Sequence, residues 1–151
     1  MQKKKAGIFS FTCCEGCTVV FMELMNKHFF DYKNRFDFVS FRQLKTSEKM
    51  QKMDFAVIEG AISTASEKRK LLEIRNSAKK IIAIGSCAVT GMPSSQRNNF
   101  KPELKKRIEK QIKQLHQLKT IEPLKKYVKV DLELNGCPVS ASQLEKIMEE
   151  L

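Results

Sequence analysis

The amino-acid sequence predicts an α/β protein built on a doubly wound parallel sheet. Strand-like and helix-like segments alternate along the 151-residue chain, and this alternation is typical of parallel strands joined by right-handed helical crossovers. Two of the strand-like segments, 55–58 and 81–84, are unbroken apolar runs, as expected of interior strands that are covered on both faces. At this length we expect one domain that spans residues 1–151.

The first part of the chain supplies three of the expected strands. In chain order we predict strands at 4–11, 36–41 and 55–58, with helices at 18–30 and 47–53 between them. The segment 36–41 alternates apolar and polar residues with a period of two, which is the strand pattern. The segment 18–30 is apolar on more than one side, which suits a helix that lies between layers.

The second part continues the alternation. We predict helices at 66–78, at 101–119 and from about Ser140 onward, strands at 81–84 and 127–134, and a loop at 91–100. The basic segment 101–119 is predicted to be helical because one apolar stripe recurs at spacings of three and four: Leu104, Ile108, Ile112, Leu115 and Leu118. The segment 127–134 alternates, and we expect one face to carry Val128, Val130, Leu132 and Leu134.

The composition of the chain indicates in which cellular compartment the protein is expected. The chain contains no uninterrupted run of about 18 apolar residues, so we expect no direct membrane span. The basic start at Met1–Lys5 is followed by a short apolar run that ends in cysteines rather than at a small-residue cleavage site, so we do not expect a signal peptide. Five cysteines are an odd number and lack the spacing of a disulfide framework. We therefore expect a reducing, cytoplasmic compartment.

The formal net charge of +11 raises the question of an anionic partner. Nucleic acid is poorly supported, because the chain has no Trp and two Tyr and its aromatic residues are not interleaved with the basic ones. The basic segment 101–129 has two interpretations: a solvated face, or an electrostatic contact with an acidic partner such as a ferredoxin.

The cysteines occur where three predicted strands end. Cys13, Cys14 and Cys17 follow the first strand, while Cys87 and Cys137 follow the fourth and fifth. The carboxyl ends of parallel strands share one edge of a sheet, which is where such sheets bind ligands. Each position is flanked by a glycine, which lets the backbone approach a bulky inorganic group. We therefore predict that the thiols converge around an iron–sulfur cluster.

Such a cluster needs four thiolates, and five are present. We favour the C-x-x-C pair Cys14 and Cys17 together with Cys87 and Cys137, which leaves Cys13 spare; the rival set uses the tandem pair Cys13–Cys14 and frees Cys17. Two other interpretations remain open. The C-x-x-C at a helix start is also the arrangement of a thioredoxin-like thiol oxidoreductase, and four cysteines can form a zinc site.

Five motifs, in this order over essentially the whole chain, carry a family resemblance. They are Cys13-Cys14-Glu15-Gly16-Cys17, Glu59-Gly60-Ala61-Ile62, Ile84-Gly85-Ser86-Cys87-Ala88, Gly91-Met92-Pro93 followed by Arg97-Asn98, and Asn135-Gly136-Cys137-Pro138. The set resembles the small subunit of nickel–iron hydrogenases and the related cluster-bearing 20-kilodalton subunit of respiratory complex I. The basic segment 101–129 has no counterpart in this pattern.

The resemblance implies a flavodoxin-like domain that holds one proximal [4Fe–4S] cluster on Cys14, Cys17, Cys87 and Cys137. It implies an electron-transfer small subunit facing a large catalytic subunit of nickel–iron or quinone-site type, with a further redox subunit or ferredoxin as second partner. No catalytic centre is then expected on this chain alone. Glu59 is expected near the cluster or the large-subunit interface. Because no cysteine follows Cys137, the chain resembles a single-cluster form.

Overall fold

The computed structural model describes residues 3–41 and 50–151, and its centre is a five-stranded parallel sheet. The strands of this sheet are β1 (Lys4–Ser10), β2 (Phe36–Phe41), β3 (Met53–Glu59), β5 (Ala78–Ile84) and β7 (Leu132–Leu134). Their order across the sheet is β2-β1-β3-β5-β7, and every neighbouring pair is parallel. Counted along the chain, this is the flavodoxin-like order 2-1-3-4-5, which confirms the predicted fold class.

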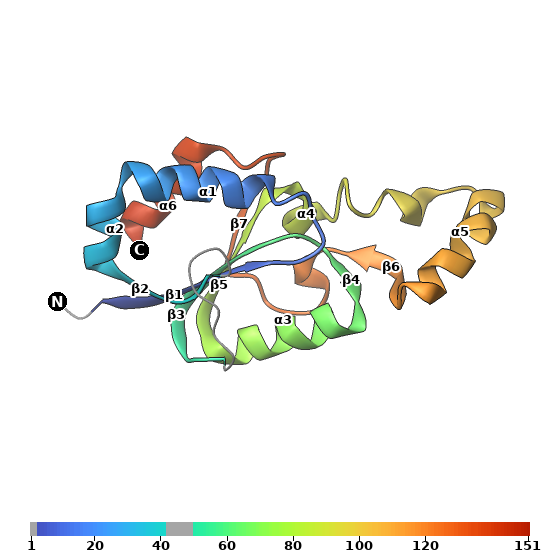
Figure 1. Ribbon diagram of the computed structural model, residues 1–151, viewed down its shortest axis with the longest axis horizontal. Coiled ribbons are helices and arrows are strands. Elements are labelled where there is room, and N and C mark those ends of the chain that lie inside the picture. The colour runs from blue at the N-terminus through green and yellow to red at the C-terminus, as the bar shows by residue number, and fades with distance from the viewer. Residues whose placement is uncertain (1–2, 42–49) are drawn as a thin grey trace.

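Helices cover both faces of the sheet (Figure 1). One face carries α1 (Gly16–Lys27), α2 (Phe29–Arg35) and α6 (Ala141–Glu150), and the other carries α3 (Ala65–Ser77). The interior strand β3 explains why two layers form: Phe55 and Val57 pack in the core beneath α1 and α6, whereas Ala56 and Ile58 pack in the core above α3. A strand buried on both faces therefore has no polar side in its centre, as its sequence predicts.

A smaller unit projects from the carboxyl edge of the sheet, and we call residues 96–122 the lobe. Its elements, with those that join it to the body, are β4 (Ile62–Thr64), α4 (Gly85–Thr90), η1 (Gln96–Asn99), α5 (Pro102–Gln114), β6 (Gln117–Glu122) and η2 (Leu124–Lys126). β6 pairs antiparallel with β4. The Asn98 amide clamps η1 to β6, since it donates to the Ile121 carbonyl at 2.7 Å and accepts from the Ile121 N–H at 3.0 Å. α5 lies at the end of the molecule opposite both chain ends (Figure 1).

The predicted helix over 101–119 was too long. α5 ends at Gln114, because the chain enters the left-handed region at His116, with φ of 51°, and then extends into β6. Leu118 therefore lies in a strand and not on the helical stripe. The short strand β4 was not predicted, because its three residues give too little periodicity to recognise.

The predicted strand over 127–134 is confirmed only at its end, 132–134. The Asp131 carboxylate accepts from the Ile81 N–H at 2.8 Å, and the Asp131 N–H donates to the Ile81 carbonyl at 2.9 Å, so pairing with β5 starts there. Val128 and Val130 pack in the core above α3, while Leu134 packs on the opposite core. The expectation that they share one face was wrong.

Two further boundaries moved. The predicted helix 18–30 is divided: α1 ends at Lys27 and α2 continues to Arg35, with His28 between them outside helical geometry. Of the predicted helix 47–53, residues 47–49 lie outside the described residues. The remainder of that prediction was wrong, since residues 50–52 are irregular and Met53 begins β3. None of the helices in the described part of the chain combines the length and the hydropathy that a membrane crossing requires.

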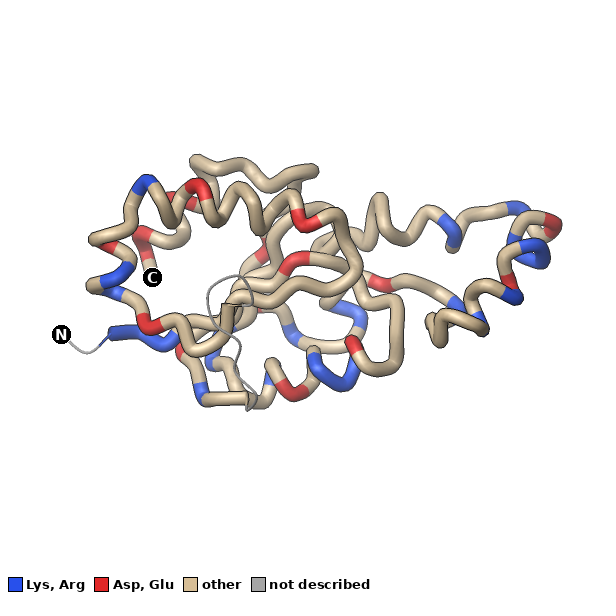
Figure 2. Tube along the Cα trace, in the orientation of Figure 1, with Lys and Arg blue, Asp and Glu red and all other residues tan. Residues whose placement is uncertain are grey.

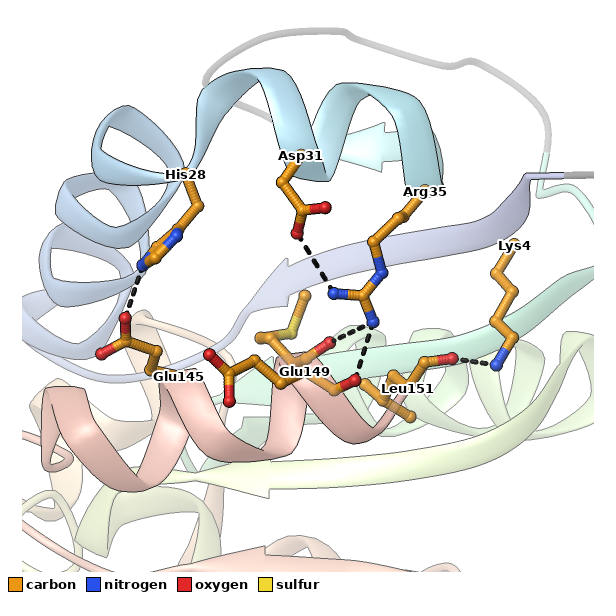
Figure 3. Close-up of polar contacts among 8 residues, drawn as sticks. Lys4, His28, Asp31, Arg35, Glu145, Glu149 and Leu151 are labelled. Carbon is orange, nitrogen blue, oxygen red and sulfur yellow. Dashed lines mark hydrogen bonds and ion pairs between the residues drawn. The ribbon is translucent and has the colours of Figure 1, made fainter. Parts of the chain in front are cut away.

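The C-terminal helix is held by side chains from α2 and β1 (Figure 3). The Arg35 guanidinium donates to the carbonyl oxygens of Met148 and Glu149 at 3.0 and 2.9 Å, and the Lys4 ammonium donates to the Leu151 carbonyl. The first two carbonyls belong to the last turn of α6 and the third follows it directly. Carbonyl groups at this end of a helix have no intrahelical N–H partner and carry the negative end of the helix dipole. A cation at this place therefore fixes α6 against the sheet.

We expect Arg35→Met to lower the free energy of unfolding by about 1–2 kcal/mol, because the two carbonyl groups lose a charged donor. Chemical denaturation followed by circular dichroism measures this change. Asp31→Asn is the matched control, since it removes only the half-exposed ion pair to Arg35 at 3.2 Å and should cost less than about 0.5 kcal/mol. Equal losses in both variants would mean that the contact to α6 contributes nothing.

Candidate metal centre

All five cysteines line one small pocket at the carboxyl edge of the sheet. The pocket has a volume of about 120 Å³, and Glu59, Gly60, Gly85, Gly136 and Pro138 are among its other lining residues. The cysteines follow the ends of β1, β5 and β7, with Cys17 in the first turn of α1 and Cys87 in α4, and Glu59 comes from the end of β3. The structure thus brings together every thiol that the sequence places at a strand end. Which four of them bind a metal group stays a prediction.

The first cysteine loop is fixed above the end of β3. The Thr12 N–H donates to the Ala61 carbonyl at 3.1 Å, and the Ala61 N–H donates to the Thr12 carbonyl at 2.9 Å. Gly60 makes this approach possible, because a Cβ there would lie 2.7 Å from the Phe11 carbonyl carbon. Glu15, just before α1, has φ of 62°, an uncommon left-handed conformation for a residue with a side chain. The loop turns sharply enough for Cys14 and Cys17 to reach the same pocket.

Cys17 lies between the loops that carry Cys87 and Cys137. Its sulfur accepts the Val139 N–H at 3.4 Å, and a Cβ at Gly85 would lie 2.4 Å from it. Gly85 has φ of +82°, so only glycine meets both requirements without strain. The Ser86 N–H donates to the Gly136 carbonyl at 2.7 Å and ties the two loops together.

Cys87 is held by the segment that leads into the lobe. The Ser94 hydroxyl lies 3.2 Å from the Cys87 sulfur and 3.1 Å from the Thr12 carbonyl oxygen. This one side chain therefore spans two cysteine loops. Sequence reasoning missed Ser94, because it belongs to a loop without periodicity; its only signal is its place in the Gly91-Met92-Pro93 motif region.

Glu59 is a buried carboxylate, 2% exposed, at the floor of the pocket. Its two oxygens accept from the Thr18 N–H at 3.1 Å, from the Thr18 hydroxyl at 2.5 Å and from the Ser10 hydroxyl at 3.0 Å. A carboxylate at the start of α1 is favourable, because the first helical N–H groups lack partners and carry the positive end of the dipole. Glu59 thereby joins β3, β1 and α1 beneath the thiols.

Burial is the main influence on the pKa of two thiols, those of Cys13 and Cys17. Removal from water raises the pKa of the Cys13 thiol and of the Cys17 thiol to about 11, and the neighbouring Glu59 carboxylate acts in the same direction. The attacking thiol of a thioredoxin-like site has a lowered pKa, so Cys17 is not suited to that role. Metal binding forms the thiolates directly and releases their protons.

The pocket fits an iron–sulfur cluster in its donor chemistry. Thiolates are the ligands such clusters require, and glycine backbone leaves room beside them while N–H groups reach their sulfurs. Among the described residues, no three His, Cys, Asp or Glu side chains come close enough to hold one metal ion. A cluster does not need that convergence, since each of its thiolates binds a different iron atom.

Residues 14–151 match the family profile described as "NADH ubiquinone oxidoreductase, 20 Kd subunit". The chain belongs to this family. The match begins at Cys14 and includes Cys17, Cys87 and Cys137, so the family relationship covers the candidate centre as well as the fold. This confirms the resemblance found in the sequence motifs.

Two individual proteins are similar to this chain in sequence. Sulfhydrogenase 2 subunit delta of Pyrococcus furiosus is 27% identical over 147 residues, which are 97% of this chain and 61% of that protein. An uncharacterized protein of Methanocaldococcus jannaschii is 30% identical over 111 residues, which are 70% of this chain and 44% of that protein. The chain thus spans less than two thirds of these curated relatives.

Solved structures confirm the fold. A chain of an NAD+-reducing [NiFe]-hydrogenase in the H2-reduced state superposes with a TM-score of 0.86 at 22% identity, over 98% of this chain and 90% of that one. A chain of the Ni-Fe-Se hydrogenase of Desulfomicrobium baculatum superposes with a TM-score of 0.68 at 13% identity, over 98% of this chain and 61% of that one.

Proposed function

We propose that this chain is an electron-transfer subunit that carries one [4Fe–4S] cluster on Cys14, Cys17, Cys87 and Cys137. It relays electrons to or from a catalytic site on a large partner subunit of nickel–iron hydrogenase type, within a reducing, cytoplasmic compartment. The observation that carries the proposal is the convergence of thiols from three strand ends on one pocket.

The protein's own groups set the properties of the centre. A bound cluster supplies reversible one-electron transfer, and its potential depends on hydrogen bonds to its sulfurs and on burial. The Val139 N–H and the Ser94 hydroxyl supply such bonds to Cys17 and Cys87. Cys14 and Cys137 are exposed, so one side of the pocket faces outward. A large subunit that covers this side would exclude water from the centre.

The hydrogenase assignment is supported by two relatives whose names refer to hydrogenase chemistry, one of them nearly the length of this chain. The second candidate is a subunit of a quinone-reducing complex, which the description of the family supports. In both cases the catalytic metal or quinone lies on another chain, and this chain supplies the electron path.

Anaerobic expression together with its co-purifying partners tests the proposal. We expect a brown protein with broad visible absorption, about four irons per chain and a large companion chain that contains nickel. A companion without nickel that reduces a quinone would establish the second candidate. A colourless protein without iron that catalyses disulfide reduction would overturn the cluster and support the thiol oxidoreductase instead.

A further inference from the structure

A groove of about 670 Å³ lies between α5 and β6 in the lobe, away from the cysteine pocket. We call it the basic groove. Its lining includes Arg97, Lys105, Ile108, Ile112, Lys113 and Lys119. None of these residues lines the cysteine pocket, so the groove is a separate feature whose purpose the electron relay leaves unexplained.

The apolar part of the groove belongs to α5, whose apolar stripe is only partly covered by the described residues. α5 contains no buried residue, although apolar side chains recur along one stripe. Ile108 and Ile112 are half-buried in the groove, and the stripe continues at its ends with Leu104, 38% exposed, and Leu115, 63% exposed. An amphipathic helix normally gains its stability by burying such a stripe. The groove therefore offers an apolar seat that the described part of this chain does not fill.

The edge of the groove is strongly basic. Residues 97–122 contain eight Lys or Arg and three Glu, and Figure 2 shows the basic positions along α5. Glu109 pairs with Lys113 at 2.8 Å. Within residues 3–41 and 50–151, Lys105, Lys106 and Lys119 have no carboxylate partner in a salt bridge. The apolar groove lining thus lies beside three lysines that have no salt-bridge partner among the described residues.

We propose that the basic groove binds an acidic amphipathic helix of a partner protein. Its apolar residues would contact Ile108 and Ile112, and its carboxylates would pair with Lys105 and Lys119. α5 has 13 residues, so it can support a helix of about 20 Å. This is helix-in-groove recognition with electrostatic complementarity. The proposal does not depend on the cluster, since none of these residues lines the cysteine pocket.

Other occupants fit the groove less well. A second copy of the chain carries the same net charge of +11 and would be repelled. An anionic membrane takes up apolar side chains that protrude, whereas Ile108 and Ile112 lie within a hollow. Among the described residues no aromatic side chain lines the groove, so this part of the chain offers no stacking surface of the kind that single-stranded nucleic acid uses.

Fluorescence anisotropy with the full 151-residue chain tests the proposal. The probe is a labelled helical peptide of about 16 residues, with a leucine stripe flanked by glutamates. A scrambled peptide of the same composition controls for the stripe. The groove variant Lys105→Glu/Lys119→Glu is compared with Arg107→Glu/Lys110→Glu, which makes the same charge change at two residues outside the groove lining. Circular dichroism verifies that both variants fold.

We expect saturable binding to the wild-type chain that weakens as salt is added. The groove variant should bind roughly tenfold more weakly, and the control variant within about twofold of wild type. Ile112→Ser should also weaken binding without changing the net charge. Equal losses in the two charge variants, or equal binding of the scrambled peptide, would overturn the proposal. Displacement of the peptide by phosphatidylserine vesicles or by single-stranded DNA at lower concentration would also overturn it, in favour of those partners.

Discussion

Gly85→Ala is expected to remove most of the iron from the protein and to leave the sheet folded. A Cβ at this position would lie 2.4 Å from the Cys17 sulfur, and the backbone φ of +82° is unfavourable for any residue with a Cβ. The strain costs about 1–3 kcal/mol, and relieving it moves either Cys17 or the loop of Cys87. Iron analysis and visible absorption after anaerobic purification measure the loss, and far-ultraviolet circular dichroism reports whether the fold is retained.

Gly16→Ala is the matched control, because Gly16 lines the same pocket. A Cβ there would lie 3.4 Å from the Cys14 sulfur and 3.9 Å from the Pro138 Cβ, distances of ordinary contact. Gly16 is also the first residue of α1, where alanine is no worse a helix former than glycine. This variant should keep its iron. If Gly85→Ala also kept a full complement of iron, the close approach of Gly85 to Cys17 would not be needed to hold a cluster.

The sheet could be predicted because its strands are either continuously apolar or alternate apolar and polar residues. In addition, parallel strands must be joined by crossover connections, which are usually helices. β3 and β5 are recognisable without any knowledge of their neighbours. The same reasoning identifies the carboxyl edge as the place where the cysteines meet. Functional side chains that directly follow parallel strands can thus be predicted to lie close together, because these strand ends share one edge of the sheet.

The lobe could not be predicted in the same way. Leu115 and Leu118 continue the spacing of the α5 stripe, yet the chain reverses at His116 and pairs β6 with β4. That pairing depends on tertiary contacts, among them the Asn98 clamp on Ile121, which leave no local pattern. Similarly, the apolar residues of the alternating segment 127–134 pack in two different cores, because the chain joins the sheet only at Asp131.

The contacts around the thiols were also beyond the sequence. Ser94 and Cys87 are only seven residues apart, but their contact depends on the path of an irregular loop that also reaches Thr12. Glu59 was expected near the centre, and the structure adds its role: it holds the start of α1, so that Cys17 and Thr18 are positioned by the end of a different strand.

The five cysteines are not expected to be equivalent. Replacing Cys14, Cys17, Cys87 or Cys137 singly with serine should remove the cluster, whereas Cys13→Ser should retain about four irons per chain. The hydrogen bonds of Cys13 and Cys17 indicate which of the two is the ligand. Cys13 is satisfied within its own loop as a protonated thiol, since its sulfur donates to the Phe11 carbonyl at 3.4 Å and accepts the Glu15 N–H at 3.3 Å.

The Cys17 sulfur, in contrast, accepts the Val139 N–H and donates no hydrogen bond among the described residues, an arrangement that suits a ligating thiolate. It also lies against Gly85, between the loops of Cys87 and Cys137, so it is central to the set. Iron content and the electron paramagnetic resonance of the reduced protein measure each variant. Retained iron in Cys17→Ser together with lost iron in Cys13→Ser would establish the tandem pair Cys13–Cys14 as ligands instead.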